Sequence, residues 1–409
     1  MIEKLKQAKA ASKVLGIISV SKINKALENI SKELINNLEF ILKENEKDII
    51  AAKEKNISKA MIDRLLLTKE RIKSISEDVL KIKEINFDID KVLDTFTTKE
   101  GLLIEKVRVP FGVIGAIYEA RPNVSVDIAV LCLKTKNVCV LKGGSEALNS
   151  NKAIVKVMHQ AISGILPVEA ITFIDDTNRE KVLELIKAKE YLDLVVPRGG
   201  KNLINFVVEN SLVPVIETGA GICHLYIEKE ANLDKALRIA HNAKTSRPSV
   251  CNAIETILVD EAVAETFLPQ LKDLFTKSNV IIKGCKKTRE IIECEKASEI
   301  DFATEYLDLI VSVKVVENFD EAIDHISTYS TKHSDAIITE NNKKANDFLN
   351  LVDSACVYHN ASTRFTDGGC FGFGAELGIS TQKLHARGPM ALVEMTTYKY
   401  KIHGKGQIR

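Results

Sequence analysis

The chain has 409 residues, which is too long for one ordinary hydrophobic core and predicts two or three domains. Its 57 Lys and Arg residues almost balance 56 Asp and Glu residues, and a net charge of +1 argues against a nucleic-acid or membrane-surface partner. Tryptophan is absent and aromatic residues make up 5%, which disfavours a platform for stacked bases.

The first residues do not resemble a secretory signal, because charges are scattered among the apolar residues of MIEKLKQAKAASKVLG. The sequence contains no run of about 18 apolar residues, so we expect no membrane-spanning helix. The eight cysteines are dispersed, without a CxxC pair or a Cys/His cluster at zinc-ligand spacing. We therefore expect a cytoplasmic protein with reduced thiols and no metal site.

The first 95 residues are predicted to be mainly helical. Apolar residues recur at steps of three and four from Ile23 to Ile41, which predicts an amphipathic helix with Ser21 as its N-cap. The many charged residues of this segment are expected to form a solvated face.

The pattern changes near Thr97. Two β-prone runs on either side of Glu100 and Gly101 predict a hairpin, and a buried strand follows it. Strand-like runs then alternate with amphipathic helices as far as VPVIETG, which is interpreted as an apolar strand ending in Glu217. This alternation predicts a parallel sheet that is covered by helices on both faces.

A second alternating series follows Gly221. It begins with the helical segment LDKALRIAHNAK and ends with NNKKANDFLNLVDS, which predicts a second α/β domain. The C-terminal tail is different, because it combines glycine and basic residues with the β-prone run ALVEMTTYKYKI. We expect this run to form a strand that packs elsewhere, with another subunit as one option.

Two corners between a strand and a helix contain paired glycines, Gly143–Gly144 and Gly199–Gly200. At the carboxyl end of a parallel strand, such glycines let backbone N–H groups approach a phosphate. Neither corner matches the G-x-G-x-x-G fingerprint, so ordinary tight turns are the alternative. Lys142 precedes the first corner, where its amine either contacts a phosphate or ribose hydroxyl or faces solvent.

Cys251 is the best candidate for a reactive thiol. It lies in the polar segment TSRPSVCN, and the charge of Arg247 favours a thiolate if the two side chains are close. Cys132 and Cys139, in contrast, lie in an apolar run and are interpreted as structural. From these residues alone, a nucleophile and a buried filler are equally good interpretations of Cys251.

Six motifs occur in order along the chain: VRVPFGVIGAIYEARPNVSVDIA, VLKGGSEALNSN, VPRGGKNLI, IETGAGICHLYI, RPSVCNAIETILVD and GISTQKLHARGPMALVEMTTYKY. Together they resemble the gamma-glutamyl phosphate reductases, a branch of the aldehyde dehydrogenase superfamily. The resemblance extends from near Met1 to about Tyr400, and STQKLHARGPM is its most specific part. It implies an α/β fold with two Rossmann-like parallel-sheet domains plus a β oligomerisation flap.

The resemblance also implies a division into three parts. The NADP-binding domain would comprise residues 1–95, 113–225 and 357–380, and the catalytic domain residues 226–356. Residues 96–112 and 381–409 would form the oligomerisation flap of a homodimer or homotetramer.

The activity implied by the resemblance is NADPH-dependent reduction of L-glutamyl 5-phosphate to L-glutamate 5-semialdehyde in proline biosynthesis. The choice of NADPH over NADH, and an association with glutamate 5-kinase, are left open by the residues. One alternative is an aldehyde dehydrogenase that oxidises a small aldehyde, against which the specific C-terminal motif argues. Another is a catalytically silent metabolite-binding protein, against which the retained Cys251, Asn123 and Lys142 argue.

Residue by residue, the resemblance makes Cys251 the nucleophile that forms a thioester, and Asn123 an oxyanion-hole amide. Glu217 matches the general base of aldehyde-oxidising relatives. Arg247 and Arg121 are expected to bind the substrate. The implied cofactor-binding residues are Lys142, Gly143, Ser145, Glu146, Pro197, Arg198 and Gly199.

Three positions depart from the family pattern. Ser246 and Ser249 stand where the family more often has Gln and Gly, and Cys370 stands where cysteine is unusual. None of these changes removes a chemical group that the mechanism needs. Ser249 is expected to affect the flexibility of the loop around Cys251.

Overall fold

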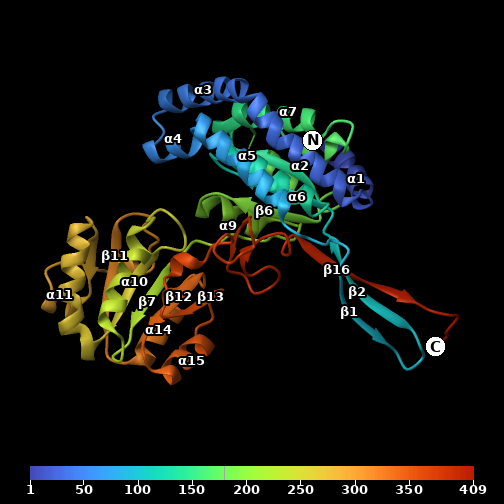
Figure 1. Ribbon diagram of the computed structural model, residues 1–409. Helices are drawn as coiled ribbons and strands as arrows, with labels where there is room; N and C mark the ends of the chain where they lie inside the picture. The colour runs from blue at the N-terminus through green and yellow to red at the C-terminus, as the bar shows by residue number, and fades with distance from the viewer. Residues whose placement is uncertain (179) are drawn as a thin grey trace. The chain divides into compact units, whose positions relative to one another are not determined.

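The computed structural model describes residues 1–178 and 180–409 of the chain (Figure 1). The described chain divides into two compact units, with a four-stranded parallel sheet in unit 1 and a seven-stranded parallel sheet in unit 2. Unit 1 comprises Met1–Glu217, Phe373–Leu377 and Met390–Arg409. Unit 2 comprises Thr218–Gly372 and Gly378–Pro389.

Unit 1 begins with a series of helices, which confirms the helical character predicted for this part of the chain. They are α1 (Ile2–Gly16), α2 (Val20–Asn36), α3 (Leu38–Glu54), α4 (Lys59–Leu65) and α5 (Lys69–Glu84). The predicted apolar stripe of α2 is buried, and α2 packs against α5 and α7 (Leu148–Ile162). Burial of this stripe, more than local propensity, stabilises the helix.

The helix predicted through Ile41 is two helices instead of one. α2 ends before Asn37 and α3 begins after it, because Asn37 leaves helical geometry with φ −104° and ψ 20°. Its side-chain amide donates to the carbonyl oxygen of Glu33 at 2.9 Å and so satisfies a backbone group at the end of α2. The N-cap is Ser19 and not Ser21, because the extended Ser19 accepts a backbone N–H of the first turn.

The parallel sheet of unit 1 has the strand order β5-β4-β3-β6. Its strands are β3 (Val113–Tyr118), β4 (Val138–Gly143), β5 (Ile171–Phe173) and β6 (Leu194–Arg198). The other helices of this region are α6 (Asn123–Lys134), α8 (Glu180–Ile186), α9 (Lys201–Asn210) and the 3₁₀ turns η1 (Ser145–Ala147) and η2 (Val168–Ala170). Every residue of β3 and β4 is buried, as predicted for strands covered on both faces.

The segment VPVIETG is not the strand that the sequence predicts. Only Val215 forms an isolated parallel bridge, to Val195 of β6. Pro214 precedes it and has no N–H with which to extend a ladder. Glu217 therefore follows an irregular segment.

Three strands of unit 1 form an antiparallel sheet, which we call the flap sheet. They are β1 (Val92–Thr97), β2 (Leu103–Pro110) and β16 (Thr396–His403), with β2 in the centre. The predicted hairpin is thus confirmed as β1 and β2. The C-terminal strand finds its β-partner in its own chain, because β16 pairs with β2 along its whole length.

Unit 2 contains a parallel sheet with the strand order β10-β9-β11-β8-β7-β12-β13. These strands are β7 (Cys223–Ile227), β8 (Ile254–Asp260), β9 (Ile281–Gly284), β10 (Glu295–Lys296), β11 (Ile310–Val316), β12 (Ser334–Ile338) and β13 (Cys356–His359). Its helices are α10 (Leu233–Thr245), α11 (Glu261–Lys277), α12 (Lys286–Ile291), α13 (Glu299–Phe302), α14 (Phe319–Tyr329), α15 (Asn342–Leu351) and the 3₁₀ turn η3 (Thr363–Phe365). Two short strands, β14 (Gly378–Ser380) and β15 (Gly388–Met390), pair with each other.

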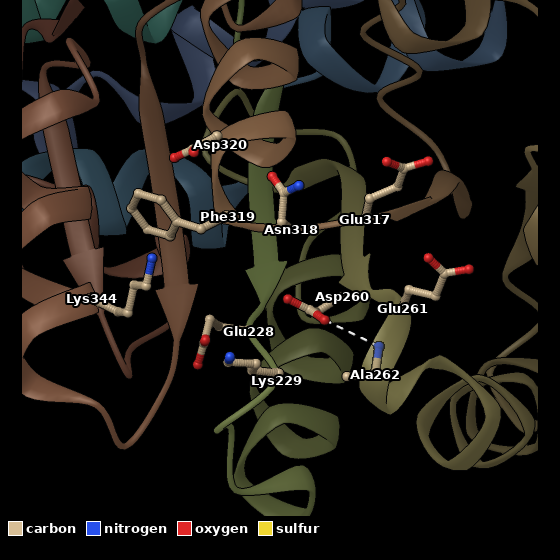
Figure 2. Close-up of a pocket in the computed structure, with 10 residues that line it drawn as sticks. All are labelled: Glu228, Lys229, Asp260, Glu261, Ala262, Glu317, Asn318, Phe319, Asp320 and Lys344. Carbon is tan, nitrogen blue, oxygen red and sulfur yellow. Dashed lines mark hydrogen bonds between the residues drawn. The ribbon is translucent and has the colours of Figure 1, made fainter.

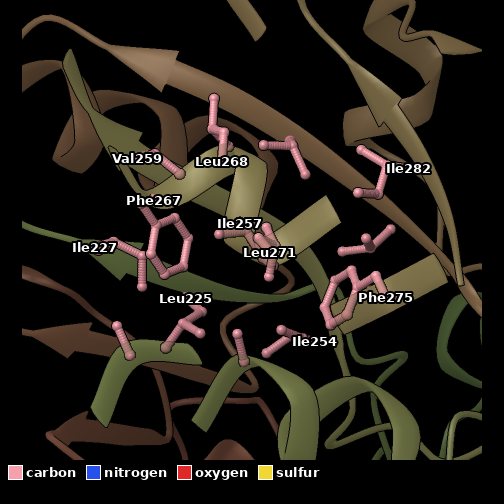
Figure 3. Packing of buried hydrophobic residues seen from close by; sticks show 14 of the residues in the cluster. Leu225, Ile227, Ile254, Ile257, Val259, Phe267, Leu268, Leu271, Phe275 and Ile282 are labelled. Atoms are coloured by element: carbon pink, nitrogen blue, oxygen red, sulfur yellow. The ribbon is translucent and has the colours of Figure 1, made fainter. Parts of the chain in front are cut away.

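Alternate residues of the central strands of unit 2 enter two different cores. Leu225 of β7 packs in the core that includes α10 and α11, whereas the next residue, Tyr226, packs with α14 and α15. Figure 3 shows the first core, where Phe267 and Phe275 of α11 lie among strand side chains. Burying each such side chain contributes about 1.5–3 kcal/mol, and together they fix the positions of the strand ends.

The two compact units do not coincide with the three expected parts. Residues 218–225 and 357–372 belong to unit 2, because β7 and β13 pair within its sheet. Residues 378–380, expected in the NADP-binding domain, and 381–389, expected in the flap, also belong to unit 2. The assignment of cofactor binding, catalysis and oligomerisation to the three expected parts stays a prediction.

Candidate active site

Cys251 lies in unit 2, in the loop between α10 and the amino end of β8, and its side chain is half-buried. Gly221, just before β7, lies directly against this loop. A Cβ atom at Gly221 would be 1.5 Å from the carbonyl oxygen of Cys251. Only glycine permits this approach, so the position of the thiol depends on Gly221.

A histidine from a distant part of the sequence faces the thiol. His333, immediately before β12, places Nε2 3.2 Å from Sγ of Cys251. The ring is fully buried, and burial lowers the pKa of His333 to about 4, opposed in part by the charge of Asp335. The imidazole is therefore neutral at pH 7, and a neutral imidazole can accept the proton of a thiol.

The other side of the imidazole is held by polar contacts. His333 Nδ1 lies 2.9 Å from Ser334 Oγ, which lies 2.7 Å from Thr366 Oγ1. Cys223 also lies close, with its Sγ 3.7 Å from Nδ1, and its thiol donates to the carbonyl oxygen of Cys251 at 3.2 Å. These contacts fix the ring plane relative to the thiol.

The residue after the thiol clamps the loop to the segment around η3. The Asn252 side-chain amide donates to the carbonyl oxygen of Thr366 at 2.8 Å, and the Thr363 hydroxyl donates to the carbonyl oxygen of Asn252 at 2.7 Å. The thiol loop is thus polar and ordered, and Cys251 is not a filler of an apolar core.

Two arginines lie on the same side of unit 2. Arg247 is exposed, and Arg364 of η3 donates through Nε to Ser246 Oγ at 3.1 Å and through Nη1 to Asn252 Oδ1. Burial lowers the pKa of Arg364 and repulsion from Arg247 lowers it further, whereas attraction to Asp367 and, less strongly, to Cys251 opposes these effects. Arg364 lies near the thiol and Arg247 lies near Arg364, and neighbouring guanidinium groups favour a ligand that carries negative charge.

The predicted cofactor residues lie in unit 1, at the carboxyl edge of its sheet. Tyr118 at the end of β3 pairs in register with Gly143 of β4 and with Arg198 of β6. The order β5-β4-β3-β6 reverses direction at the neighbours β3 and β6, the kind of position where open α/β sheets bind ligands. The structure thus brings both glycine corners to one edge.

Two glycines at this edge are closely approached by side chains of the chain itself. A Cβ atom at Gly143 would be 2.2 Å from Asn151 Nδ2, and one at Gly199 would be 2.5 Å from Glu119 Oε2. Glu119 also accepts the backbone N–H of Gly200 at 2.9 Å. A side chain at Gly143 or Gly199 would therefore displace a neighbouring side chain, whether or not a ligand binds.

Lys142 is buried at the end of β4, and its amine donates to the carbonyl oxygen of Gly143 at 3.1 Å. Burial lowers the pKa of Lys142. Ser145 is exposed at the start of η1, and Glu146 accepts the backbone N–H of Ala120 at 2.6 Å. A buried amine next to exposed polar groups fits a ribose or phosphate, because a further acceptor offsets the desolvation of the charge.

Pro197 is buried within β6, whereas Arg198 is half-buried and Gly199 is exposed. A proline suits this strand, because β6 is an outer strand of its sheet. Of these three residues, Arg198 and Gly199 present polar groups at the carboxyl edge.

Asn123, Arg121 and Glu217 also lie in unit 1. The Asn123 amide donates to Asp127 Oδ2 at 2.9 Å, and the surroundings of Asp127 raise its pKa to about 6 by desolvation. Arg121 is exposed and Glu217 is half-buried. Cys251 and Arg247 belong to unit 2, so the joint action of these residues with the thiol stays a prediction.

The opposite edge of the unit 2 sheet carries an acidic pocket. Figure 2 shows Glu228, Asp260, Glu317 and Asp320 around it, where β7, β8 and β11 end, with Lys344 at its side. Cys251 precedes β8, so this pocket lies away from the thiol. Its carboxylates repel an anionic substrate.

Within residues 1–178 and 180–409, no group of three or more His, Cys, Asp or Glu side chains is arranged to hold a metal ion. No helix in the same described part of the chain is long and apolar enough to cross a membrane.

A model described as the aldehyde dehydrogenase family matches residues 3–289. The gamma-glutamyl phosphate reductase of Nautilia profundicola is 52% identical over 410 residues, covering 100% of each chain. The crystal structure of the gamma-glutamyl phosphate reductase of Thermotoga maritima has a TM-score of 0.98 and 47% identity, covering 100% of this chain and 99% of that one. The chain belongs to the gamma-glutamyl phosphate reductase family of aldehyde dehydrogenases.

More distant structures share the fold of this family. An acetylating aldehyde dehydrogenase from Geobacillus thermoglucosidasius is 18% identical, with a TM-score of 0.70 over 100% of this chain and 97% of that one. The predicted aldehyde-dehydrogenase-like α/β fold, with two parallel sheets and an additional antiparallel sheet, is confirmed.

Two residues of the thiol site, His333 and Arg364, were not predicted from the sequence. His333 is 82 residues from Cys251 and stands directly before the strand-like run SDAII. The loops before β8 and β12 reach the same edge of a parallel sheet. A polar residue directly before each strand was therefore the sequence feature that could have linked His333 to Cys251. Arg364 lies in η3, for which the sequence has no strong pattern.

Proposed function

We propose that this protein reduces L-glutamyl 5-phosphate to L-glutamate 5-semialdehyde, with release of phosphate, in proline biosynthesis. The half-buried thiol of Cys251 beside the neutral imidazole of His333 carries the proposal, because a covalent acyl intermediate requires an activated nucleophile. Whole-length similarity to gamma-glutamyl phosphate reductases supports it. We place the enzyme in the cytoplasm.

In this proposal, the Cys251 sulfur attacks the acyl carbon of the substrate, and the bond from that carbon to the phosphate oxygen breaks. The product on the protein is a thioester. The Asn123 amide and the backbone N–H of Cys251 stabilise the negative charge that develops on the acyl oxygen, a term worth about 3–4 kcal/mol per donor. Glu217 orients groups near the thioester, since reduction needs no hydrolytic water.

NADPH is the proposed reductant, and when bound it supplies a hydride to the acyl carbon. The residues that we propose to hold it are Lys142, Gly143, Ser145, Glu146, Pro197, Arg198 and Gly199. The buried Lys142 amine fits a ribose hydroxyl or phosphate, and Arg198 adds a donor at the same edge. Unit 1 is accordingly the proposed NADP-binding part and unit 2 the catalytic part.

Arg247 is the proposed ligand of the substrate phosphate or carboxylate, together with Arg364. Support comes from the mutual repulsion of the two guanidinium groups, which a bound dianion would relieve. Arg121 is proposed as a further substrate contact. The homodimer or homotetramer is proposed to form through the flap sheet, whose β1 is exposed along its length, and an association with glutamate 5-kinase would deliver the labile substrate.

The reverse reaction tests the proposal without the labile acyl phosphate. The protein is incubated with glutamate 5-semialdehyde, phosphate and NADP⁺, and formation of NADPH is followed by absorbance. We expect turnover that depends on phosphate and is lost in Cys251→Ala but kept in Cys370→Ser, which changes an exposed thiol. Turnover without phosphate would instead favour an oxidising aldehyde dehydrogenase, and a wild type as inactive as Cys251→Ala would contradict both activities.

A further inference from the structure

We propose that His333 is a further catalytic residue, which carries the proton of the Cys251 thiol to the departing phosphate. The inference rests on the proposed function for the identity of the leaving group. The acid–base pairing of His333 with the thiol rests on the geometry of unit 2 alone.

The contact between the two groups is suited to proton transfer. Nε2 of His333 lies 3.2 Å from Sγ of Cys251, and both residues belong to unit 2. The ring is 0% exposed, so bulk water does not compete for its nitrogen atoms. The thiol itself is half-buried and remains accessible to a substrate.

Polar contacts behind the ring accommodate the tautomer that a general base requires. With the proton on Nδ1, His333 donates to Ser334 Oγ, and Ser334 donates on to Thr366 Oγ1, which also contacts the Tyr358 hydroxyl at 2.7 Å. The Cys223 thiol donates its proton to the carbonyl oxygen of Cys251 and therefore not to Nδ1 of His333. This arrangement leaves the lone pair of Nε2 facing the thiol of Cys251, as a general base requires.

The charges around the ring keep it neutral until the reaction begins. The groups that face it are the thiols of Cys251 and Cys223, the carboxylate of Asp335 and, through Thr366, the Tyr358 hydroxyl. Asp335 stabilises an imidazolium only in part, because it also accepts the backbone N–H of His224 at 2.8 Å. Desolvation outweighs it and lowers the pKa of His333 to about 4.

The proton and the electron pairs balance in this step. As the Cys251 sulfur forms a bond to the acyl carbon, its proton moves to His333 Nε2. The electron pair of the carbon–oxygen bond leaves with the phosphate, and Nε2 returns the proton to that oxygen. The phosphate therefore departs as the hydrogen phosphate dianion, and His333 is neutral again without any other acid.

Alkylation of Cys251 by iodoacetamide, quantified by mass spectrometry of its peptide, tests the pairing without any substrate. In His333→Gln we expect alkylation at neutral pH to be at least about tenfold slower than in the wild type. The two rates should converge at high pH, where the thiol ionises without help. His241→Gln, which changes a half-buried histidine on α10 that contacts Ser278, should behave as the wild type. Equal rates in wild type and His333→Gln at neutral pH would overturn the inference.

The pH profile of the wild type provides a test that needs no variant. Because the pKa of His333 is lowered to about 4, the neutral base is present above that pH and is lost only as the pH falls through about 4. Alkylation should therefore be nearly constant between about pH 5 and 7. A rate that rises tenfold with each pH unit, as for an isolated thiol, would overturn the inference.

Steady-state kinetics in the reverse direction separate this inference from the proposed function. We expect His333→Gln to lower kcat by about 10²–10⁴-fold, with the KM for the aldehyde within a few-fold of the wild type. Ser334→Ala removes the hydroxyl that contacts Nδ1 of His333, so the tautomer with its proton on Nδ1 loses its hydrogen-bond acceptor. This variant should lower kcat by a smaller factor than His333→Gln. An active wild type with an equally active His333→Gln would overturn the role of His333. An inactive wild type that retains the alkylation difference would instead overturn the proposed substrate.

Discussion

The two edges of the unit 2 sheet carry opposite chemistry. The amino edge holds Cys251, His333 and two arginines, whereas the carboxyl edge holds a pocket lined by carboxylates (Figure 2). Open α/β sheets usually bind ligands at their carboxyl edge. Unit 1 has its glycine corners at that edge, whereas Cys251 and His333 of unit 2 lie at the amino edge, so a candidate site must be found from side chains and not from topology alone.

Outside the Cys251–His333 pair itself, the largest effect is expected from a methyl group at the amino edge. Gly221→Ala would place Cβ 1.5 Å from the carbonyl oxygen of Cys251, so the thiol loop must move. We expect kcat to fall by about 10²-fold, the usual result of a misplacement of about 1 Å. Gly16→Ala is the matched control, because a Cβ there meets nothing within 4 Å. Unchanged kinetics in Gly221→Ala would show that the loop is not positioned by this contact.

A second effect concerns stability in acid. The pKa of His333 is lowered to about 4 from its usual 6.5, so the folded state gains stability above pH 6.5 and loses it as the pH falls toward about 4. The loss attributable to His333 is at most about 3 kcal/mol. His325 is also buried and its pKa is lowered to about 2, so part of the pH dependence of the unfolding free energy remains when His333 is replaced. Denaturant unfolding at several pH values should show that the unfolding free energy depends less steeply on pH in His333→Gln than in the wild type. An identical pH dependence in the two proteins would argue against a buried neutral ring.

A smaller effect is expected from the arginine that was not predicted. Arg364→Met removes a guanidinium that contacts Ser246 and Asn252, and in the reverse assay we expect the KM for phosphate to rise about tenfold. The KM for NADP⁺ should change little. Arg238→Met, on the exposed face of α10, serves as the control for a lost surface charge. A KM for phosphate equal to that of the control would remove Arg364 from the proposed phosphate site.

The smallest effect is expected at the carboxyl edge of unit 2. Glu317→Gln removes an exposed carboxylate whose ion pair with Lys287 spans 3.5 Å, and we expect unfolding free energy within about 0.5 kcal/mol of the wild type. Activity should be unchanged, because this pocket lies at the other end of the strands from Cys251. A large loss of activity would mean that the carboxyl edge of unit 2 also takes part in the reaction.

The local part of this structure was predictable from the sequence. The apolar stripe of α2, the hairpin of β1 and β2 and the alternating strands and helices all follow from periodicity, and all are present. The errors occurred where a single residue competes with the pattern. Asn37 ends a helix that apolar spacing alone would continue, and Pro214 prevents the strand expected before Glu217.

Part of the site was also present in the sequence by itself. The polar loop around Cys251, the glycine corners and the ordered motifs pointed to the thiol and to the family, because nearby residues define them. What only the tertiary structure decided is the partner of the thiol. His333 meets Cys251 because parallel pairing brings the loops before β8 and β12 to the same sheet edge, and pairing between distant strands depends on packing of the whole core. No local pattern in the chain encodes that distance.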